Sequence, residues 1–326
     1  MPRREITYLQ GIREGLQYVL RTHPETVLFG EDVAAFGGAF KMTTGFLDAF
    51  GADRVFDTPI AESAMLGAAI GMATQGLKPI VELQFADFAT TALHQLLNNA
   101  GTLHYRTGVP VPLTVRAPCG GGFGGGPFHS EELEAIFCHM PGIKVVYPAF
   151  PSDARSLIVS AVLDPNPVIF LENKFLYRHV KEDVETDIAP VPLGCARICR
   201  PGTDATVVTY GAMVHTAIHA AETVAHETGA EVMVLDLRSL KPLDTQAILA
   251  AAATGRVLVL HEAWRTCGLG AEVAALIAEQ AFHHLDAPVR RLTAPDCPVP
   301  FAPELEAAYR PDEPTVTEAL LDLLET

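Results

Sequence analysis

The stretch Val55-Phe-Asp-Thr-Pro-Ile-Ala-Glu-Ser-Ala-Met-Leu-Gly-Ala-Ala-Ile-Gly-Met72 decides how the chain is interpreted. It begins as a strand, turns at Pro59 and continues as a helix whose residues are nearly all small or apolar. Glu62 stands at the start of that helix. A carboxylate there can simply complement the positive end of the helix dipole. Because an apolar helix buries its faces, the carboxyl is also expected to be half-buried, and burial raises a carboxyl pKa toward values useful for proton transfer. Helix capping and a role in catalysis are therefore both open for Glu62.

The start of this helix does not match a capping box. With Thr58 as the N-cap and Pro59 as the first helical residue, the box would need its acid at Ala61. Gly67 and Gly71 lie four residues apart on one face of the helix, where the missing side chains let another backbone approach closely. The stretch therefore predicts a closely packed helix with a single acid near its N-terminus.

The composition describes a folded, acidic protein. The 326 residues allow two domains, each with a core of its own, and 49% apolar residues argue against disorder. Lys and Arg number 23 against 39 Asp and Glu, and the net charge of −16 disfavours nucleic acid and anionic membranes as partners. No apolar run reaches the roughly 18 residues of a membrane span. The start, Met1-Pro-Arg-Arg-Glu5, lacks the apolar core of a signal peptide, so we expect a cytoplasmic protein.

Strand and helix patterns alternate along most of the chain. The first part has predicted helices over 7–22, 59–72, 90–105 and 151–163, and predicted strands over 27–29, 79–83, 111–115, 144–150 and 168–172. The last part has predicted strands over 205–210, 231–237, 256–260 and 289–292, separated by helices over 213–228, 244–253 and 271–282. This alternation indicates mainly parallel sheets with helices on both faces. We expect an α/β protein with domains 1–185 and 203–326, joined by a charged, proline-punctuated linker over 186–202.

The glycine-rich loop Gly120-Gly-Gly-Phe-Gly-Gly-Gly126 contains the Gly-x-Gly-x-x-Gly pattern of dinucleotide sites, after a predicted strand. Such a site also needs an acid at the end of the next strand, about 20 residues further on. The strand from Lys144 to Phe150 has none. We interpret the glycines as a mobile loop that delivers His129, which suits general acid or base catalysis near neutral pH. The alternatives are a surface histidine near a helix start and a nucleotide site on this chain alone.

Two further patterns have both a structural and a functional interpretation. Phe85 and Phe88 follow a strand, where one of them could stack on a flat heteroaromatic ring or both could belong to the core. The turn Asp164-Pro-Asn-Pro167 is rich in oxygen atoms and could hold a hard cation or simply reverse the chain.

Taken together, these segments resemble the beta chain of the decarboxylating, thiamine diphosphate-dependent component of 2-oxoacid dehydrogenase complexes, a transketolase-like family. The similarity covers nearly the whole chain, and it is carried by Phe29-Gly-Glu-Asp-Val33, Arg54-Val-Phe-Asp-Thr-Pro-Ile-Ala-Glu62, Gln84-Phe-Ala-Asp-Phe88, Pro141-Gly-Ile-Lys-Val-Val146, Leu171-Glu-Asn-Lys174 and Asp236-Leu-Arg-Ser-Leu240. The segments His261-Glu-Ala-Trp-Arg-Thr-Cys-Gly268 and Phe282-His-His-Leu-Asp-Ala-Pro288 most resemble bacterial branched-chain members. The resemblance implies a pyrimidine-binding domain followed by a transketolase C-terminal-like domain.

The resemblance also implies roles for individual residues. Glu62 would activate thiamine diphosphate by a hydrogen bond to its aminopyrimidine ring, on which Phe88 would stack and beside which Gln84 would lie. His129 would aid transfer of the acyl group to the lipoyl arm. A potassium ion would be held, mostly by backbone oxygens, at Leu113, Thr114, Ala161, Asp164 and Asn166.

Two departures from the family pattern concern the surroundings of these residues. Family members usually have Gln where this chain has Glu131, and usually Asp where it has His94. A carboxylate at position 131 could alter the charge state of His129. We therefore expect the histidine to be the site residue most affected by the departures.

The chain lacks the Gly-Asp-Gly motif with which thiamine diphosphate enzymes hold the diphosphate and its magnesium ion. The resemblance assigns that half of the site to an alpha subunit, with the cofactor bound between chains of an α2β2 heterotetramer. The acidic surface suits a basic binding domain of the lipoyl acyltransferase core. The implied reaction is decarboxylation of a 2-oxoacid, with a branched-chain acid as the first choice, and acyl transfer to lipoamide. The alternatives are a pyruvate or acetoin dehydrogenase beta subunit, and a non-catalytic assembly partner with this fold.

Overall fold

The computed structural model describes residues 3–326. Two compact units share the chain, and neither is continuous in sequence. The first unit runs to Cys119 and resumes over Ile136–Leu193, and the second combines Gly120–Ala135 with Gly194–Thr326. The glycine-rich loop therefore leaves the first unit and packs with the second. The domain boundaries expected from the sequence remain a prediction.

A parallel sheet forms the centre of the first unit. Its strands follow in the order β6 (Lys144–Val146), β7 (Val168–Asn173), β5 (Thr114–Cys119), β4 (Lys78–Glu82), β2 (Thr26–Gly30) and β3 (Val55–Asp57). Strands β2, β5 and β7 are buried at every residue, as expected for parallel strands covered on both faces. A separate antiparallel pair joins β1 (Arg3–Thr7) to β8 (Lys181–Glu185).

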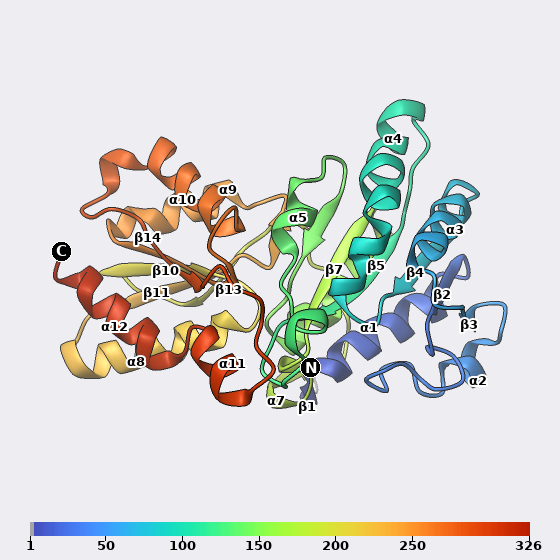
Figure 1. The fold of residues 1–326 in the computed structure, drawn as a ribbon, viewed down its shortest axis with the longest axis horizontal. Helices are drawn as coiled ribbons and strands as arrows, with labels where there is room; N and C mark the ends of the chain where they lie inside the picture. Colours follow the sequence, from blue (N-terminus) through green and yellow to red (C-terminus); the bar gives the residue numbers. More distant parts are fainter. Residues whose placement is uncertain (1–2) are drawn as a thin grey trace. The chain divides into compact units, whose positions relative to one another are not determined.

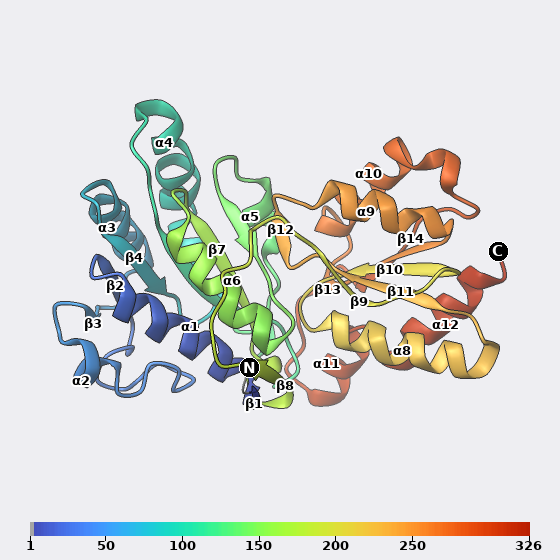
Figure 2. The same ribbon diagram turned by 180° about the vertical axis from the view of Figure 1, so that it is seen from behind.

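Helices cover both faces of this sheet. Helices α1 (Tyr8–Thr22) and α6 (Pro151–Leu163) lie in front of it in Figure 2, and α3 (Glu62–Thr74) and α4 (Gly101–Thr107) lie in front of it in Figure 1. A Cβ atom at Gly11 of α1 would lie 2.4 Å from the carbonyl oxygen of Pro151, so the helices approach as closely as only glycine permits. The short helices α2 (Phe46–Phe50) and α7 (Leu176–His179) complete the unit.

Helix α3 begins at Glu62, and the expected start at Pro59 is wrong. The backbone of Ala61 has φ −163° and ψ 66°, which is not helical, and Ala61 has no side chain that could cap the helix. Glu62 is thus the first helical residue, where its charge can complement the exposed N–H groups of the first turn.

Two other elements of the first unit differ from their predicted bounds. The helix expected over 90–105 is a 3₁₀ helix η1 (Ala86–Ala92), a π-helical turn η2 (Gln95–Ala100) and then α4. A Cβ atom at Gly101 would lie 2.6 Å from the carbonyl oxygen of Pro141, so another segment of the chain packs closely against the start of α4. The strand expected over 111–115 is β5, which starts at Thr114, because Pro110 and Pro112 have no N–H to donate to a neighbouring strand.

The second unit contains a five-stranded sheet. Its order is β14 (Arg290–Ala294), β13 (Val257–Trp264), β10 (Ala205–Thr209), β11 (Val232–Asp236) and β9 (Arg197–Arg200), and only β9 runs antiparallel to its neighbour. Helices α8 (Met213–Thr228) and α12 (Glu313–Leu324) lie on one face, and α9 (Thr245–Ala251) and α10 (Leu269–Gln280) lie on the other (Figures 1 and 2). The strand β9 lies within the segment expected to be a linker. Helices α5 (Glu134–His139) and α11 (Pro303–Tyr309) and strand β12 (Ser239–Lys241) complete the regular elements.

The expected α/β architecture is confirmed. Within residues 3–326, no helix combines the length and the apolar character needed to cross a membrane.

Candidate cofactor and active site

The carboxyl ends of three neighbouring strands position the candidate cofactor residues. The last residues of β3, β2 and β4 are Asp57, Gly30 and Glu82, and the pairing register places Gly30 opposite both of the others. Ligands of parallel α/β sheets bind outside this edge. The chain passes from β3 to Glu62 and from β4 to Gln84, so both predicted residues follow the same edge of the sheet.

Glu62 is half-buried and tied to the segment that carries Phe88. Its Oε2 accepts a hydrogen bond from the hydroxyl of Thr91 at 3.1 Å. The same hydroxyl lies 2.9 Å from the carbonyl oxygen of Phe88. The half-burial expected from the sequence is thus observed. The carboxylate lies at the start of α3, and one of its oxygens accepts a hydrogen bond from η1.

Gln84 lies on the turn after β4, and Phe88 lies on the 3₁₀ helix η1 that follows it. The Phe88 ring meets the Phe85 ring edge to face, with centroids 5.6 Å apart, and Phe88 is half-buried. The Gln84 side-chain amide is 3.5 Å from a carboxylate oxygen of Asp32, at the limit of a hydrogen bond. The structure therefore brings Glu62 and Phe88 together through Thr91, and it places Gln84 on the connecting turn.

Glu31 is a further acid at this sheet edge, and its importance was missed in the sequence. It directly follows β2, is only 5% exposed, and its Oε1 has no hydrogen-bond partner. Burial raises the pKa of this carboxyl, and the charges of Glu62 and Asp32 raise it further. An unpartnered buried carboxyl close to Glu62 fits a site that receives the polar ring of a ligand. The available signal was an acid placed immediately after a strand of apolar residues.

Helix α3 also has an unusual outer surface. Its buried residues are Met65, Leu66, Ala69, Ile70 and Ala73. The opposite side is exposed at Ala64, Ala68 and Gly71, and Ile60 before the helix is 81% exposed. A Cβ atom at Gly71 would meet nothing within 4 Å, so this glycine makes no close contact within the chain. The helix is small and apolar on the side that faces solvent as well as on the side that faces the core.

The five residues of the expected potassium site all belong to the first unit, at the start of β5, at the end of α6 and on the turn before β7. The carbonyl oxygen of Leu113 accepts from the N–H of Val168 at 2.8 Å, and that of Ala161 accepts from the N–H of Asp164 at 3.3 Å. The Asp164 carboxylate binds the Lys144 ammonium at 2.5 Å and the N–H of Asn166 at 2.9 Å.

Thr114 supplies the observation that bears on a cation. Its hydroxyl oxygen is buried and has no hydrogen-bond partner. Carbonyl oxygens have a second lone pair, and rings of such neutral oxygens suit potassium. The residues therefore fit a potassium ion held by neutral oxygens, because Lys144 already neutralises the carboxylate of Asp164.

His129 belongs to the second unit, at the end of the glycine-rich loop. It is half-buried and follows the 3₁₀ turn η3 (Gly126–Phe128), and its N–H lies 3.3 Å from the carbonyl oxygen of Gly126. Gly122 and Gly124 of the loop donate their N–H groups to the two carboxylate oxygens of Glu306, each at 2.9 Å. This argues against the nucleotide alternative, because the amides that a phosphate would need already bind a carboxylate of the chain.

Buried polar groups surround the start of α5, five residues beyond His129. The Tyr210 hydroxyl donates to the Glu134 carboxylate at 2.8 Å, and the ring of Tyr210 stacks on that of His261 with centroids 5.9 Å apart. Burial raises the pKa of Glu134 to about 7, although the Tyr210 hydrogen bond acts in the opposite direction. Burial also lowers the pKa of His261 to about 4, so this histidine is neutral at physiological pH.

The two departures from the family pattern lie in different surroundings. His94 is exposed, and its Nδ1 lies 3.1 Å from the side-chain amide of Asn98. Glu131 is half-buried. The expected influence of Glu131 on His129 remains a prediction.

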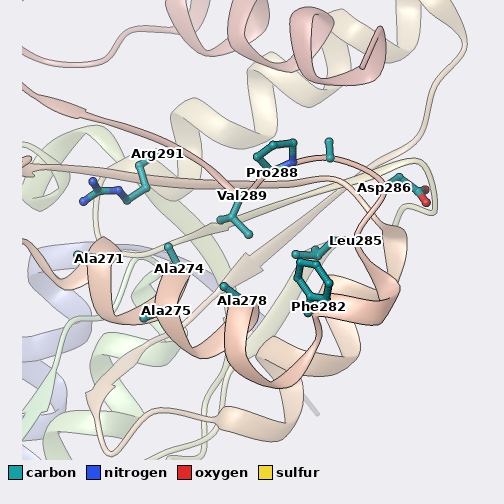
Figure 3. Close-up of a pocket in the computed structure, with 11 residues that line it drawn as sticks. Ala271, Ala274, Ala275, Ala278, Phe282, Leu285, Asp286, Pro288, Val289 and Arg291 are labelled. Atoms are coloured by element: carbon teal, nitrogen blue, oxygen red, sulfur yellow. The ribbon is translucent and has the colours of Figure 1, made fainter.

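The second unit also contains an apolar groove of about 670 Å³. Figure 3 shows Ala271, Ala274, Ala275 and Ala278 along one side of α10, across from the segment that carries Val289. Its charged lining residues are Asp286 and Arg291. None of the predicted site residues lines this groove, so its size does not make it the candidate for the chemistry.

Comparison with known proteins gives a match over each part of the chain. Residues 4–180 match the family Transketolase, pyrimidine binding domain, and residues 194–316 match Transketolase, C-terminal domain. The chain is 43% identical to 2-oxoisovalerate dehydrogenase subunit beta of Pseudomonas aeruginosa, with 98% of this chain and 95% of that protein covered. It is 39% identical to pyruvate dehydrogenase E1 component subunit beta of Bacillus subtilis, with 98% and 99% covered.

Among solved structures, a split gene transketolase described as an inactive beta4 tetramer has the same fold. The TM-score is 0.81 at 24% identity, and 98% of each chain is covered. The fold and the two matched domains place the protein in the transketolase-like class, whose pyrimidine-binding domain is characteristic of thiamine diphosphate proteins. Within that class, the chain belongs to the family of 2-oxoacid dehydrogenase beta subunits. The resemblance seen in the sequence is confirmed.

Proposed function

We propose that this chain is the beta subunit of a thiamine diphosphate-dependent 2-oxoacid dehydrogenase that decarboxylates a branched-chain 2-oxoacid and transfers the acyl group to lipoamide. The observation that carries the proposal is the half-buried Glu62 carboxylate at the first residue of α3, tied through Thr91 to the segment that carries Phe88. Thiamine diphosphate, when bound, supplies the nucleophile and the electron sink that decarboxylation of a 2-oxoacid needs.

The chain's own residues would bind and orient the cofactor ring. Glu62 would accept a hydrogen bond from a ring nitrogen of the aminopyrimidine and so hold a proton at that atom. Phe88 would cover one face of the ring, and Gln84 would lie at its edge. The unpartnered carboxyl of Glu31 supports this assignment, because a buried polar atom is expected to find a partner. His129 would act later, by moving a proton during transfer of the acyl group to the lipoyl arm.

An alpha subunit would complete the site. Because this chain has no Gly-Asp-Gly motif, the diphosphate and its magnesium ion would be bound by the alpha subunit, in an α2β2 heterotetramer. The exposed alanines and Gly71 on the outer face of α3 would pack against a neighbouring subunit at close range. The net charge of −16 suits a basic binding domain of the lipoyl acyltransferase core. A cytoplasmic location is part of the same proposal.

The choice of substrate has specific alternatives. The relative named for 2-oxoisovalerate is 43% identical and the one named for pyruvate is 39% identical, a small margin. Pyruvate and acetoin are therefore the competing substrate candidates. A non-catalytic assembly partner with this fold is the alternative from another class.

A single preparation tests the reaction and the substrate. The tagged chain is isolated from its native cells with the partners it retains, and thiamine diphosphate-dependent reduction of an artificial electron acceptor is measured with 3-methyl-2-oxobutanoate, pyruvate and acetoin. We expect an alpha chain to co-purify and the branched acid to react fastest. Preference for pyruvate would move the substrate assignment, and a loaded complex that turns over none of the three would support the assembly partner instead.

Potassium binding gives a prediction that does not depend on turnover. Because a ligand that binds only the folded state raises the melting temperature, saturating potassium should stabilise the complex by roughly 3 °C or more over sodium at equal ionic strength. Thr114→Val keeps the shape of the buried side chain but removes its unpartnered hydroxyl, so the difference should shrink in this variant. Ser160→Ala is the matched control, because the Ser160 hydroxyl already bonds the carbonyl oxygen of Val191 at 2.6 Å. An equal response of Thr114→Val and the unmodified chain to potassium would refute the site.

A further inference from the structure

The glycine-rich loop is built as a concave anion-binding surface. Gly120, Gly122, Gly124 and Gly126 all have positive φ, between 63° and 93°, and Gly125 between the last two is right-handed. Alternation of this kind turns successive N–H groups toward a common point and forms an anion site. The anion is supplied by the chain itself, because both carboxylate oxygens of Glu306 accept N–H groups of this loop at 2.9 Å.

Glu306 is itself held firmly. It lies on α11, is only 4% exposed, and stands 184 residues from the first glycine whose N–H it accepts. Four residues later, Arg310 places Nε and Nη2 each 2.8 Å from Oε2 of Glu262, which lies on β13. A charge-assisted pair of this kind fixes direction as well as distance. The end of α11 is therefore anchored to the sheet of the second unit.

The loop and the segment around α11 leave little space between them. A Cβ atom at Gly121 would lie 3.0 Å from Oε1 of Glu306 and 3.1 Å from Cδ of Arg310. A Cβ atom at Gly126 would lie 2.3 Å from the ring of Phe301. The missing side chains therefore let the loop lie directly against α11 and the residues before it.

The same loop leads directly to His129. A Cβ atom at Gly125 would lie 3.0 Å from the Cβ of His129 and 2.7 Å from the hydroxyl oxygen of Ser130. The N–H of His129 points to the carbonyl oxygen of Gly126 at 3.3 Å. The backbone of Gly125 therefore leaves no room for a side chain beside His129, and a shift of the loop backbone would move the residue that carries the imidazole.

We propose that Glu306 is a positioning residue, whose carboxylate fixes the glycine-rich loop through the N–H groups of Gly122 and Gly124 and so holds His129 in place for acyl transfer. Anchoring of the loop follows from contacts within the second unit alone. Only the link to acyl transfer rests on the proposed function. The loop is thus an anchored support for the histidine, in contrast to the mobile loop expected from the sequence.

Glu306→Gln is the decisive variant, because it keeps the size of the side chain and changes what it can accept. The amide has one accepting oxygen, and its NH₂ group would face the N–H of the second glycine. Glu304→Gln is the matched control, because this substitution removes the same charge from the same helix. Glu304 lies in the first turn of α11 and is exposed. Both variants are made in the complex that the tagged chain retains.

The first measurement is hydrogen–deuterium exchange of the peptide that covers residues 120–128, which requires no turnover. Loss of a buried hydrogen bond should speed its exchange by about 10- to 100-fold in Glu306→Gln, with no change in Glu304→Gln. Peptides from β10 and α8 report whether the unit as a whole is still folded. Unchanged exchange of residues 120–128 in a folded Glu306→Gln complex overturns the proposal.

The second measurement separates acyl transfer from decarboxylation. Acylation of a lipoyl domain should fall by about 10- to 100-fold in Glu306→Gln, as expected for a misplaced reacting group, while decarboxylation with an artificial acceptor stays nearly constant. His129→Asn serves as the reference, and Glu306→Gln should show the same split between the two reactions. An equal loss of both reactions, or no loss of acylation in spite of a released loop, overturns the positioning role.

A second variant covers the case in which Glu306→Gln does not fold. Gly124→Ala leaves Glu306 intact and has room for its methyl group, but it places alanine at φ +76°, which only glycine adopts readily. It should release the loop in the exchange measurement and reproduce the loss of acyl transfer. If the unmodified complex shows no turnover at all, the proposed function fails, and the exchange result still decides whether Glu306 anchors the loop.

Discussion

Replacing Glu62 by glutamine is expected to lower thiamine diphosphate-dependent turnover by about 10²- to 10⁴-fold, the usual contribution of a positioned acid or base. The glutamine keeps the size of the side chain and one acceptor oxygen, so the bond from Thr91 can survive. It cannot carry the charge that favours a proton on the bound aminopyrimidine ring. Turnover is measured with the artificial acceptor at saturating cofactor, on the complex with its alpha subunit.

A matched variant separates this chemistry from helix capping. Asp48 lies in the first turn of α2 in the same unit and is exposed, so Asp48→Asn also removes a carboxylate near a helix start. The capping interpretation predicts similar small losses of thermal stability and no loss of turnover for both variants. The catalytic interpretation predicts loss of turnover for Glu62→Gln alone. An assembled Glu62→Gln complex with full turnover would remove Glu62 from the mechanism.

Elements with a clear local pattern could be predicted from the sequence. The helix expected over 213–228 is α8 (Met213–Thr228), because apolar residues recur at helical spacing and Gly229 ends the helix at φ +79°. The helix expected over 151–163 is α6 for similar reasons, with Pro151 at its first position. In both cases the signals that start, continue and end the helix lie within the segment itself.

Contacts between distant segments explain what could not be predicted. Gly101, which directly follows the π-helical turn at Gln95–Ala100, lies close to the carbonyl of Pro141, in a segment about forty residues away. Of the candidate site, Glu62 and Phe88 could be found because the family motif marks them. Glu306 carries no such mark, since its role appears only when α11 meets the glycine-rich loop.

A buried ion cluster in the first unit also could not be predicted from the sequence, because its members come from segments far apart in the chain. Arg116 is 1% exposed and lies between two buried carboxylates contributed by neighbouring strands. Its Nε and Nη2 reach the two oxygens of Glu172 at 2.7 and 2.9 Å, and its Nη1 binds Glu82. The Tyr177 hydroxyl also donates to Glu172 at 2.6 Å. Burial raises the pKa of Glu82, and the attraction of Arg116 opposes that rise.

Arg116→Met is therefore expected to destabilise the protein by about 3–5 kcal/mol, the usual result of removing one partner from a buried ion pair. Methionine fills much of the space but leaves two buried carboxylates without their cation. Urea unfolding of the variant and the unmodified protein in the same assembly measures the difference. Arg4→Met is the matched control, because Arg4 pairs with Glu14 at 2.7 Å with half of its side chain exposed, and its loss should cost less than about 1 kcal/mol.

The pH dependence of the loss identifies its cause. Without Arg116, the folded-state pKa of Glu82 should rise further above its unfolded value, because burial then acts without the opposing cation. A carboxyl with a raised folded-state pKa binds more protons in the folded state than in the unfolded state. The free energy of unfolding of the protein therefore falls as the pH rises through that pKa. The difference between Arg116→Met and the unmodified protein should therefore shrink as the pH is lowered from 8 toward 5. A pH-independent difference would show that lost packing, and not uncompensated charge, destabilises the variant.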